Sequence, residues 1–152
     1  MIDIFDSRLT TVVQGAQLER LCTGAAWSEG PVWLPHGVCG DEAVLWSDIP
    51  NNRMLRWSAS EGMTVWRDRV EFTNGHTRDL NGDLLHCSHG LRAIVRTPLV
   101  NGQLRPDTPD VTVVDRYQGK RLNSPNDLIV KRDGTIWFTD PPYGIVSDRA
   151  GP

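Results

Sequence analysis

The chain repeats itself three times, and each repeat begins with an oxygen-bearing side chain at the same phase. Glu29, Asn74 and Asn126 each stand just ahead of such a repeat. The second apolar run of each repeat ends in a similar triplet: Trp46-Ser47-Asp48, Cys87-Ser88-His89 and Phe138-Thr139-Asp140. Repeats of short apolar runs about 40 to 50 residues apart are typical of β units that bury their faces only against one another. The sequence therefore predicts a series of similar β-sheets.

The turn residues repeat together with the apolar runs. Asn81-Gly82 and Asp133-Gly134 each separate two apolar runs, where a tight hairpin needs residues that tolerate positive φ. Gly40-Asp41 takes the equivalent place in the first repeat. A chance alignment of three short apolar runs is the alternative explanation, and it does not account for the matching turns.

The predicted fold class is all-β, a β-propeller of which this chain supplies about three blades. We expect blades at residues 30–69, 75–117 and 127–152, the last of them incomplete. Residues 1–17 would be an N-terminal lead-in, and residues 18–152 would be the N-terminal half of a single propeller domain. Propellers close with four to eight blades, because only a complete ring covers the face of every sheet. The 152 residues would thus be part of a longer protein.

Composition excludes several classes of function. The chain is 39% hydrophobic and 23% charged, as in ordinary globular domains, and its runs are shorter than the ~18 apolar residues of a membrane helix. The first residues carry acids where a secretory signal carries bases, so we expect a cytoplasmic protein. A net charge of −3 without a basic cluster argues against nucleic acid as a partner and favours a small molecule.

The three side chains that open the repeats form the candidate site. The first strand of each propeller blade lines the central channel, so residues at the same phase of successive blades meet around the axis. A carboxylate from Glu29 and amides from Asn74 and Asn126 would offer hard oxygen ligands for Ca²⁺, Mg²⁺ or Mn²⁺. The alternative is structural: Asn74-Gly75 is a common turn, and Asn126-Asp127 could cap a strand through side-chain to backbone bonds.

Other polar residues favour structural roles. Asp48 and Asp140 end equivalent strands, where a carboxylate commonly accepts backbone N–H bonds. His86 and His89 lie at the two ends of one predicted strand, and we expect them to pack between sheets. His76 is interpreted as a partly buried structural histidine.

Several longer strings resemble the gluconolactonase branch of the SMP-30/gluconolactonase/luciferin-regenerating-enzyme-like family. The resemblance extends from about Leu18 to Gly144. It is carried by three segments: residues 27–33 (Trp-Ser-Glu-Gly-Pro-Val-Trp), residues 45–53 (Leu-Trp-Ser-Asp-Ile-Pro-Asn-Asn-Arg) and residues 122–144, from Leu-Asn-Ser-Pro-Asn-Asp to Asp-Pro-Pro-Tyr-Gly.

The resemblance implies a six-bladed propeller that holds one divalent cation in its channel, Ca²⁺ foremost, with Zn²⁺, Mg²⁺ and Mn²⁺ as alternatives. Glu29 matches a metal ligand of the family, and Asn126 matches an asparagine that contacts metal or substrate. Asn74 and Arg121 match substrate-facing positions, although the spacing at Arg121 is longer than in animal members. The remaining ligands and the general base would come from blades beyond residue 152, so this half alone would not be an efficient enzyme.

The implied activity is hydrolysis of a sugar lactone such as glucono-1,5-lactone, in which the cation polarises the lactone carbonyl for attack by water. Two alternatives stay open. One is an organophosphate or aryl-ester hydrolase that uses the same cation, and the other is a non-catalytic propeller that serves as a binding module. The natural lactone and the oligomeric state are not determined by the sequence.

Overall fold

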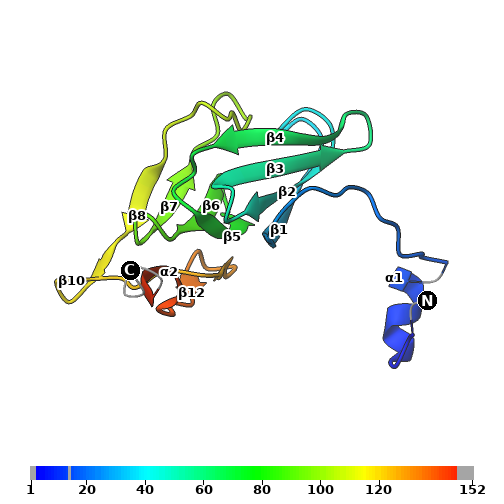
Figure 1. The fold of residues 1–152 in the computed structure, drawn as a ribbon. Helices are drawn as coiled ribbons and strands as arrows, with labels where there is room; N and C mark the ends of the chain where they lie inside the picture. The colour runs from blue at the N-terminus through cyan, green and yellow to red at the C-terminus, as the bar shows by residue number, and fades with distance from the viewer. Residues whose placement is uncertain (1–2, 14, 147–152) are drawn as a thin grey trace.

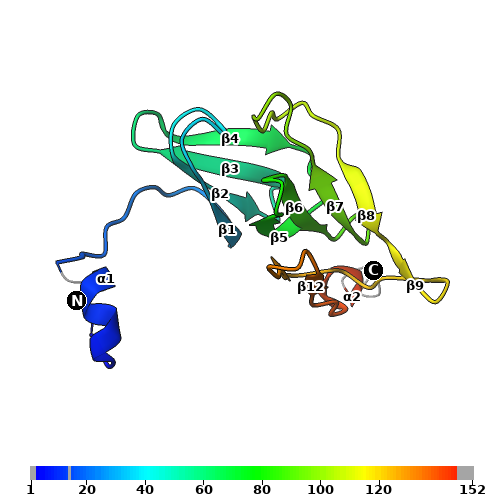
Figure 2. The same cartoon turned by 180° about the vertical axis from the view of Figure 1, so that it is seen from behind.

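A computed structural model describes residues 3–13 and 15–146 of the chain. A short 3₁₀ turn (Ser7–Leu9) leads into a one-turn helix, α1 (Thr10–Val13), which Figures 1 and 2 show set apart from the sheets. No helix within the described ranges is both long and apolar enough to cross a membrane. Among the described residues that follow α1, regular structure is β-strand, apart from the single turn of α2 (Tyr143–Val146).

The first sheet contains four antiparallel strands in chain order: β1 (Ser28–Leu34), β2 (Ala43–Asp48), β3 (Arg53–Ser58) and β4 (Gly62–Asp68). The second sheet repeats this order with β5 (Thr73–Arg78), β6 (Leu84–Ser88), β7 (Ala93–Thr97) and β8 (Val111–Val114). The predicted all-β class and the predicted repeat of antiparallel units are thereby confirmed.

Two short hairpins complete the described strands. The first pairs β9 (Arg116–Tyr117) with β10 (Lys120–Arg121), and the second pairs β11 (Leu128–Val130) with β12 (Ile136–Phe138). The predicted turn glycines have positive φ, +82° at Gly40, +87° at Gly82 and +86° at Gly134. Each hairpin between the first two strands of a repeat therefore turns where the sequence places glycine.

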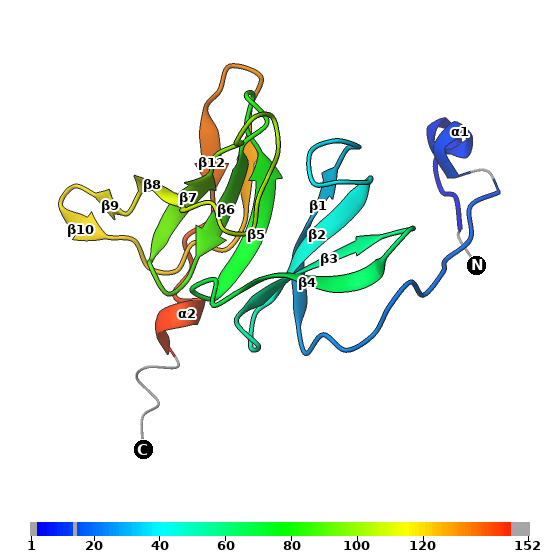
Figure 3. The same ribbon diagram turned by 90° about the horizontal axis from the view of Figure 1, so that it is seen from above.

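The sheets pack face to face through two apolar clusters. One cluster joins the first sheet to the second, and its fully buried members include Leu34, Leu45 and Leu84. The other joins the second sheet to the β11–β12 hairpin through residues such as Leu85 and Leu128. Figure 3 shows the two four-stranded sheets splayed apart, with β5 as the strand of the second sheet nearest to the first sheet. The first strand of each unit thus lies next to the first strand of the following one.

A buried polar network also crosses between the first two sheets. Ser47 Oγ lies 2.8 Å from His76 Nε2 and donates to the Asn74 carbonyl oxygen at 2.9 Å. Because the single hydroxyl hydrogen is used on Asn74, the oxygen accepts from His76, which is therefore the Nε2–H tautomer. His76 Nδ1 is buried and has no partner among the described residues. His86 stands edge-on to His76 at 5.7 Å and lies 3.3 Å from an Asp110 oxygen.

This network makes stability depend on pH. Burial, aided by the nearby His86 and Arg67, holds the pKa of His76 well below its usual value. A lowered pKa means that the unfolded chain binds more protons, so the contribution is present above about pH 6.5 and is lost as the pH falls below it. We expect the free energy of unfolding to fall as the pH drops below about 6.5, by at most about 1.4 kcal/mol per pH unit for this one group.

The variant His76→Gln, which cannot titrate, should show a shallower fall in the free energy of unfolding over this range, measured by urea denaturation at a series of pH values. His36, whose side chain is 78% exposed, provides the control, and His36→Gln should keep the steep dependence. Equal slopes for His76→Gln and the unchanged protein would contradict this assignment.

Candidate functional site

The site is built where the first strands of the three units meet. Glu29 lies near the start of β1, Asn74 near the start of β5, and Asn126 just before β11. The Gly75 amide, next to Asn74, donates to the Asn126 carbonyl oxygen at 2.8 Å. The backbone of Gly30, next to Glu29, lies against the backbone of Asn74 and Gly75. The structure therefore places the three predicted positions side by side, at or just before the starts of three neighbouring strands.

Two glycines allow this close approach. A Cβ atom built on Gly30 would lie 2.5 Å from the Asn74 carbonyl oxygen, and one built on Gly75 would lie 2.4 Å from Asp127 Oδ1 and 2.7 Å from the Asn126 carbonyl oxygen. Any side chain at these positions would push the strands apart. Gly30 also has a φ of +58°, a conformation that L-residues rarely adopt.

A register irregularity occurs near the start of the first strand in both four-stranded sheets. The pairing of β1 with β2 shifts between Glu29 and Val32, and the pairing of β5 with β6 shifts between Thr73 and His76. Bulges of this kind turn side chains to a new direction and are frequent next to active sites. The first strands therefore bend at the positions of Glu29 and Asn74.

The Glu29 carboxylate is partly exposed and held by one neighbour. Its Oε1 accepts a hydrogen bond from the Trp27 indole nitrogen at 2.9 Å. This contact orients the carboxylate and leaves further lone pairs on both oxygens for a ligand.

The two asparagines differ in exposure. Asn74 is 5% exposed, and its Nδ2 lies 3.3 Å from His89 Nε2. Asn126 is partly exposed, and its backbone nitrogen donates to the Thr139 carbonyl oxygen at 3.0 Å. The backbone of each asparagine is thus fixed, by Ser47 in one case and by Thr139 in the other.

Arg121 lies elsewhere. It ends β10, it is exposed, and its Nη2 donates to the Leu91 carbonyl oxygen at 2.9 Å. The views in Figures 1 and 3 agree that the β9–β10 hairpin lies on the side of the molecule remote from β1. The structure therefore brings Glu29, Asn74 and Asn126 together and leaves Arg121 outside this group.

In the first and third units, an aspartate at the end of the second strand accepts hydrogen bonds from the segment that leads into the first strand. Asp48 accepts from the backbone nitrogens of Ala26 and Trp27 at 2.9 and 3.2 Å. Asp140 accepts from the Asn123 nitrogen at 2.8 Å. Burial would raise the pKa of Asp48, but hydrogen bonds from its neighbours hold the pKa below the usual value. The structural roles predicted for both aspartates are confirmed.

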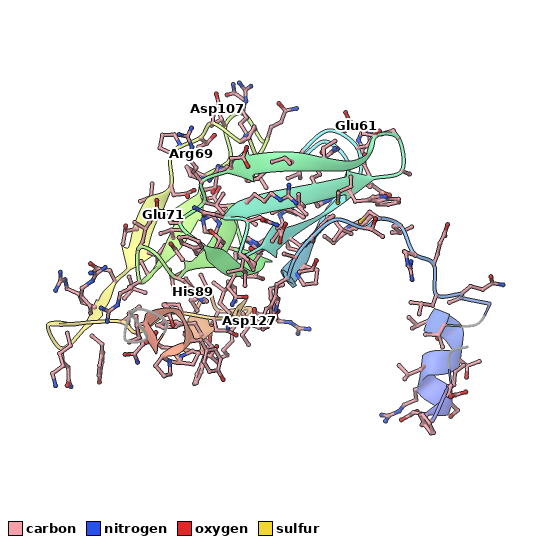
Figure 4. All side chains as sticks on the ribbon, in the orientation of Figure 1. Glu61, Arg69, Glu71, His89, Asp107 and Asp127 are labelled. Atoms are coloured by element: carbon pink, nitrogen blue, oxygen red, sulfur yellow. The ribbon has the colours of Figure 1, made fainter. Side chains whose placement is uncertain are left out.

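His89 is the residue whose contacts the sequence did not predict. It stands at the phase of Asp48 and Asp140, and its ring contacts the Asn74 amide. Figure 4 places it and Asp127 at the lower edge of the two large sheets, above β12 and α2. The shared phase was visible in the alignment of repeats, and it is the signal that could have found this residue.

The available donors suit a hard cation. Within the described part of the chain, no group of three or more His, Cys, Asp and Glu residues could hold a metal ion. A cation at this place would therefore use amide oxygens beside the Glu29 carboxylate. Carboxylate and amide oxygens are the ligands that Ca²⁺ and Mg²⁺ prefer.

Comparison with known proteins shows which family the chain resembles. Residues 27–151 match the family model described as the SMP-30/gluconolactonase/LRE-like region. A gluconolactonase of Zymomonas mobilis subsp. mobilis is 32% identical over 157 residues, which cover 94% of this chain and 41% of the relative. The chain thus spans about two-fifths of the length of that curated relative.

Solved structures show the same partial coverage. XC5397, a gluconolactonase from Xanthomonas campestris, is 47% identical with a TM-score of 0.66, covering 80% of this chain and 37% of that one. A structural-genomics target assigned as a gluconolactonase is 38% identical with a TM-score of 0.74, covering 88% and 42%. The chain belongs to the SMP-30/gluconolactonase/LRE-like family.

Proposed function

We propose that the protein hydrolyses a sugar lactone, such as glucono-1,5-lactone, to the open aldonic acid with the help of one divalent cation. The observation that carries this proposal is the meeting of Glu29, Asn74 and Asn126 on three adjacent first strands, fixed by the contacts of Gly30 and Gly75. Relatives named gluconolactonase support the choice of substrate class.

The architecture that we propose is a six-bladed propeller. The two four-stranded sheets, residues 28–68 and 73–114, would be its first two blades, and the β11–β12 hairpin would open the third. Since the chain spans about two-fifths of its relatives, the activity is proposed for a full-length protein in which further blades close the ring. The half described here would be inactive alone.

Glu29 and Asn126 are the residues that would hold the cation, for which we propose Ca²⁺ ahead of Zn²⁺, Mg²⁺ or Mn²⁺. Both are partly exposed at the meeting point of the strands, and both supply the oxygen donors that a hard ion takes. When bound, the cation would polarise the lactone carbonyl. The Trp27 indole, by donating to Glu29 Oε1, keeps the carboxylate in one orientation.

The amides would recognise the sugar. Asn74, together with Asn126, would bind ring hydroxyls, since an amide can both accept from and donate to a hydroxyl group. Arg121 stays proposed as a substrate contact, and reaching the site would require it to leave the Leu91 carbonyl. Glu29 is a poor general base because its lone pairs would be committed to the ion, so the base is expected from the remaining blades.

Removal of divalent cations tests this proposal. The full-length protein treated with a chelator should hydrolyse glucono-1,5-lactone no faster than buffer, and added Ca²⁺ should restore the rate. A lactone of the same ring size without hydroxyl groups should be hydrolysed much more slowly, because the Asn74 and Asn126 amides would have no hydroxyl group to bind. A rate that is unaffected by the chelator, or equal rates on both lactones, would contradict the proposal.

A further inference from the structure

His89 occupies a position that has a fixed duty in the other two units. In the first unit Asp48 accepts backbone N–H bonds from the segment that enters β1, and in the third unit Asp140 does the same for the segment that enters β11. In the second unit the corresponding residue is a histidine. An imidazole can donate as well as accept, so its contacts can differ in kind from those of a carboxylate.

His89 contacts a candidate site residue directly. Its Nε2 lies 3.3 Å from the Asn74 Nδ2. The ring has little freedom to move, because Gly144 packs so closely that a Cβ there would lie 3.1 Å from His89 Cβ and Cγ. One side chain therefore lies between the start of β5 and the segment that follows β12.

The charge state of the ring fixes its hydrogen bonding. Partial burial lowers the pKa of His89, so the ring is neutral at neutral pH. A neutral imidazole has one N–H and one bare nitrogen. Since an amide NH₂ group can only donate, the nitrogen that faces the Asn74 Nδ2 is the bare one, and the N–H belongs to Nδ1.

We propose that His89 is a positioning residue for Asn74, and this inference rests on the proposed lactonase function. As the Nδ1–H tautomer, His89 accepts from the Asn74 Nδ2 group at its bare Nε2. The Asn74 amide is thereby held in one of its two orientations, with Oδ1 directed away from the ring and toward the substrate. Asn74 then recognises a sugar hydroxyl as an acceptor, and the site selects lactones with a hydroxyl hydrogen to donate at that point.

Nitrogen NMR of the histidine ring tests the positioning without reference to activity. Long-range proton–nitrogen spectra of the ¹⁵N-labelled full-length protein, with His89 assigned by its absence in His89→Gln, distinguish a protonated from a bare ring nitrogen. The proposal requires Nδ1 protonated and Nε2 bare at pH 7.5. Protonation of Nε2 would overturn it, because the amide of Asn74 would then have to present its oxygen to the ring.

Two replacements test the consequence for substrate recognition. His89→Gln keeps one donor and one acceptor, whereas His89→Leu has neither. Partners that orient a binding residue typically contribute 10–100-fold, so His89→Leu should raise KM for glucono-1,5-lactone by roughly tenfold or more, while kcat changes less. The KM of His89→Gln for the same lactone should rise by no more than about threefold, which is less than the rise expected for His89→Leu.

The outcomes separate this inference from the proposed function. An equal rise in KM for His89→Gln and His89→Leu, with both proteins folded by circular dichroism, would contradict positioning by hydrogen bonds. If the unchanged protein does not hydrolyse the lactone, the proposed function fails, and the NMR result still decides whether His89 fixes the Asn74 amide.

Discussion

Glu29→Gln should lose cation binding and lactonase activity together. The substitution keeps the size of the side chain and an oxygen that can accept from the Trp27 indole, so the local fold should persist. It removes the negative charge that Glu29 contributes to the three strand starts. Loss of a residue that merely orients a ligand already costs 10–100-fold, so loss of the charged ligand should lower cation affinity by at least about a hundredfold. Calorimetric titration with Ca²⁺ and lactone hydrolysis measure the two effects.

Glu42→Gln is the matched control. Glu42 is an exposed residue immediately before β2, and its replacement changes net charge by the same amount. We expect Ca²⁺ affinity and rate to be unchanged in this variant. If Glu29→Gln retained both cation affinity and activity, Glu29 would not be a ligand.

Gly30→Ala should strongly destabilise the protein. The new Cβ would meet the Asn74 carbonyl oxygen at 2.5 Å and the Gly75 Cα at 2.6 Å, and both are backbone atoms that cannot move without shifting β5. Gly30 also has a φ of +58°, which is unfavourable for alanine by about 1–2 kcal/mol. Together with the cost of overpacking, the free energy of unfolding should fall by about 2–5 kcal/mol.

Gly62→Ala separates the cost of a positive φ from the cost of overpacking. Gly62 has a φ of +68°, and a Cβ there would meet no atom within 4 Å, so this variant should carry only the backbone cost of about 1–2 kcal/mol. Urea denaturation of the two variants compares them directly. Equal destabilisation would mean that β1 and β5 are not packed as closely as described, and the account of the site would lose its basis.

Much of this arrangement could be predicted because it depends on local patterns. Alternating apolar runs separated by Asn-Gly, Asp-Gly and Gly-Asp specify hairpins, and the repeat of these hairpins predicted a series of similar β-sheets. Glu29, Asn74 and Asn126 occupy corresponding positions in the three repeats. Because similar units place corresponding residues alike, the sequence predicted that these residues lie where neighbouring first strands begin.

The rest depends on contacts between segments that no local pattern encodes. The close approach at Gly30 and Gly75 arises from the packing of three strands, although a single sequence offers turns as the simpler explanation of both glycines. The contact of His89 with Asn74 depends on the ring turning toward the start of β5. The place of Arg121 depends on the β9–β10 hairpin, which follows β8 and was not visible in the apolar pattern.

The most direct test of the account is a crystal structure of the full-length protein grown with Ca²⁺. We expect one cation peak where the first strands meet, with an oxygen of the Glu29 carboxylate and Asn126 Oδ1 both at about 2.3–2.6 Å from it. A cation bound elsewhere, or Glu29 and Asn126 too far apart to share one ion, would contradict the central claim.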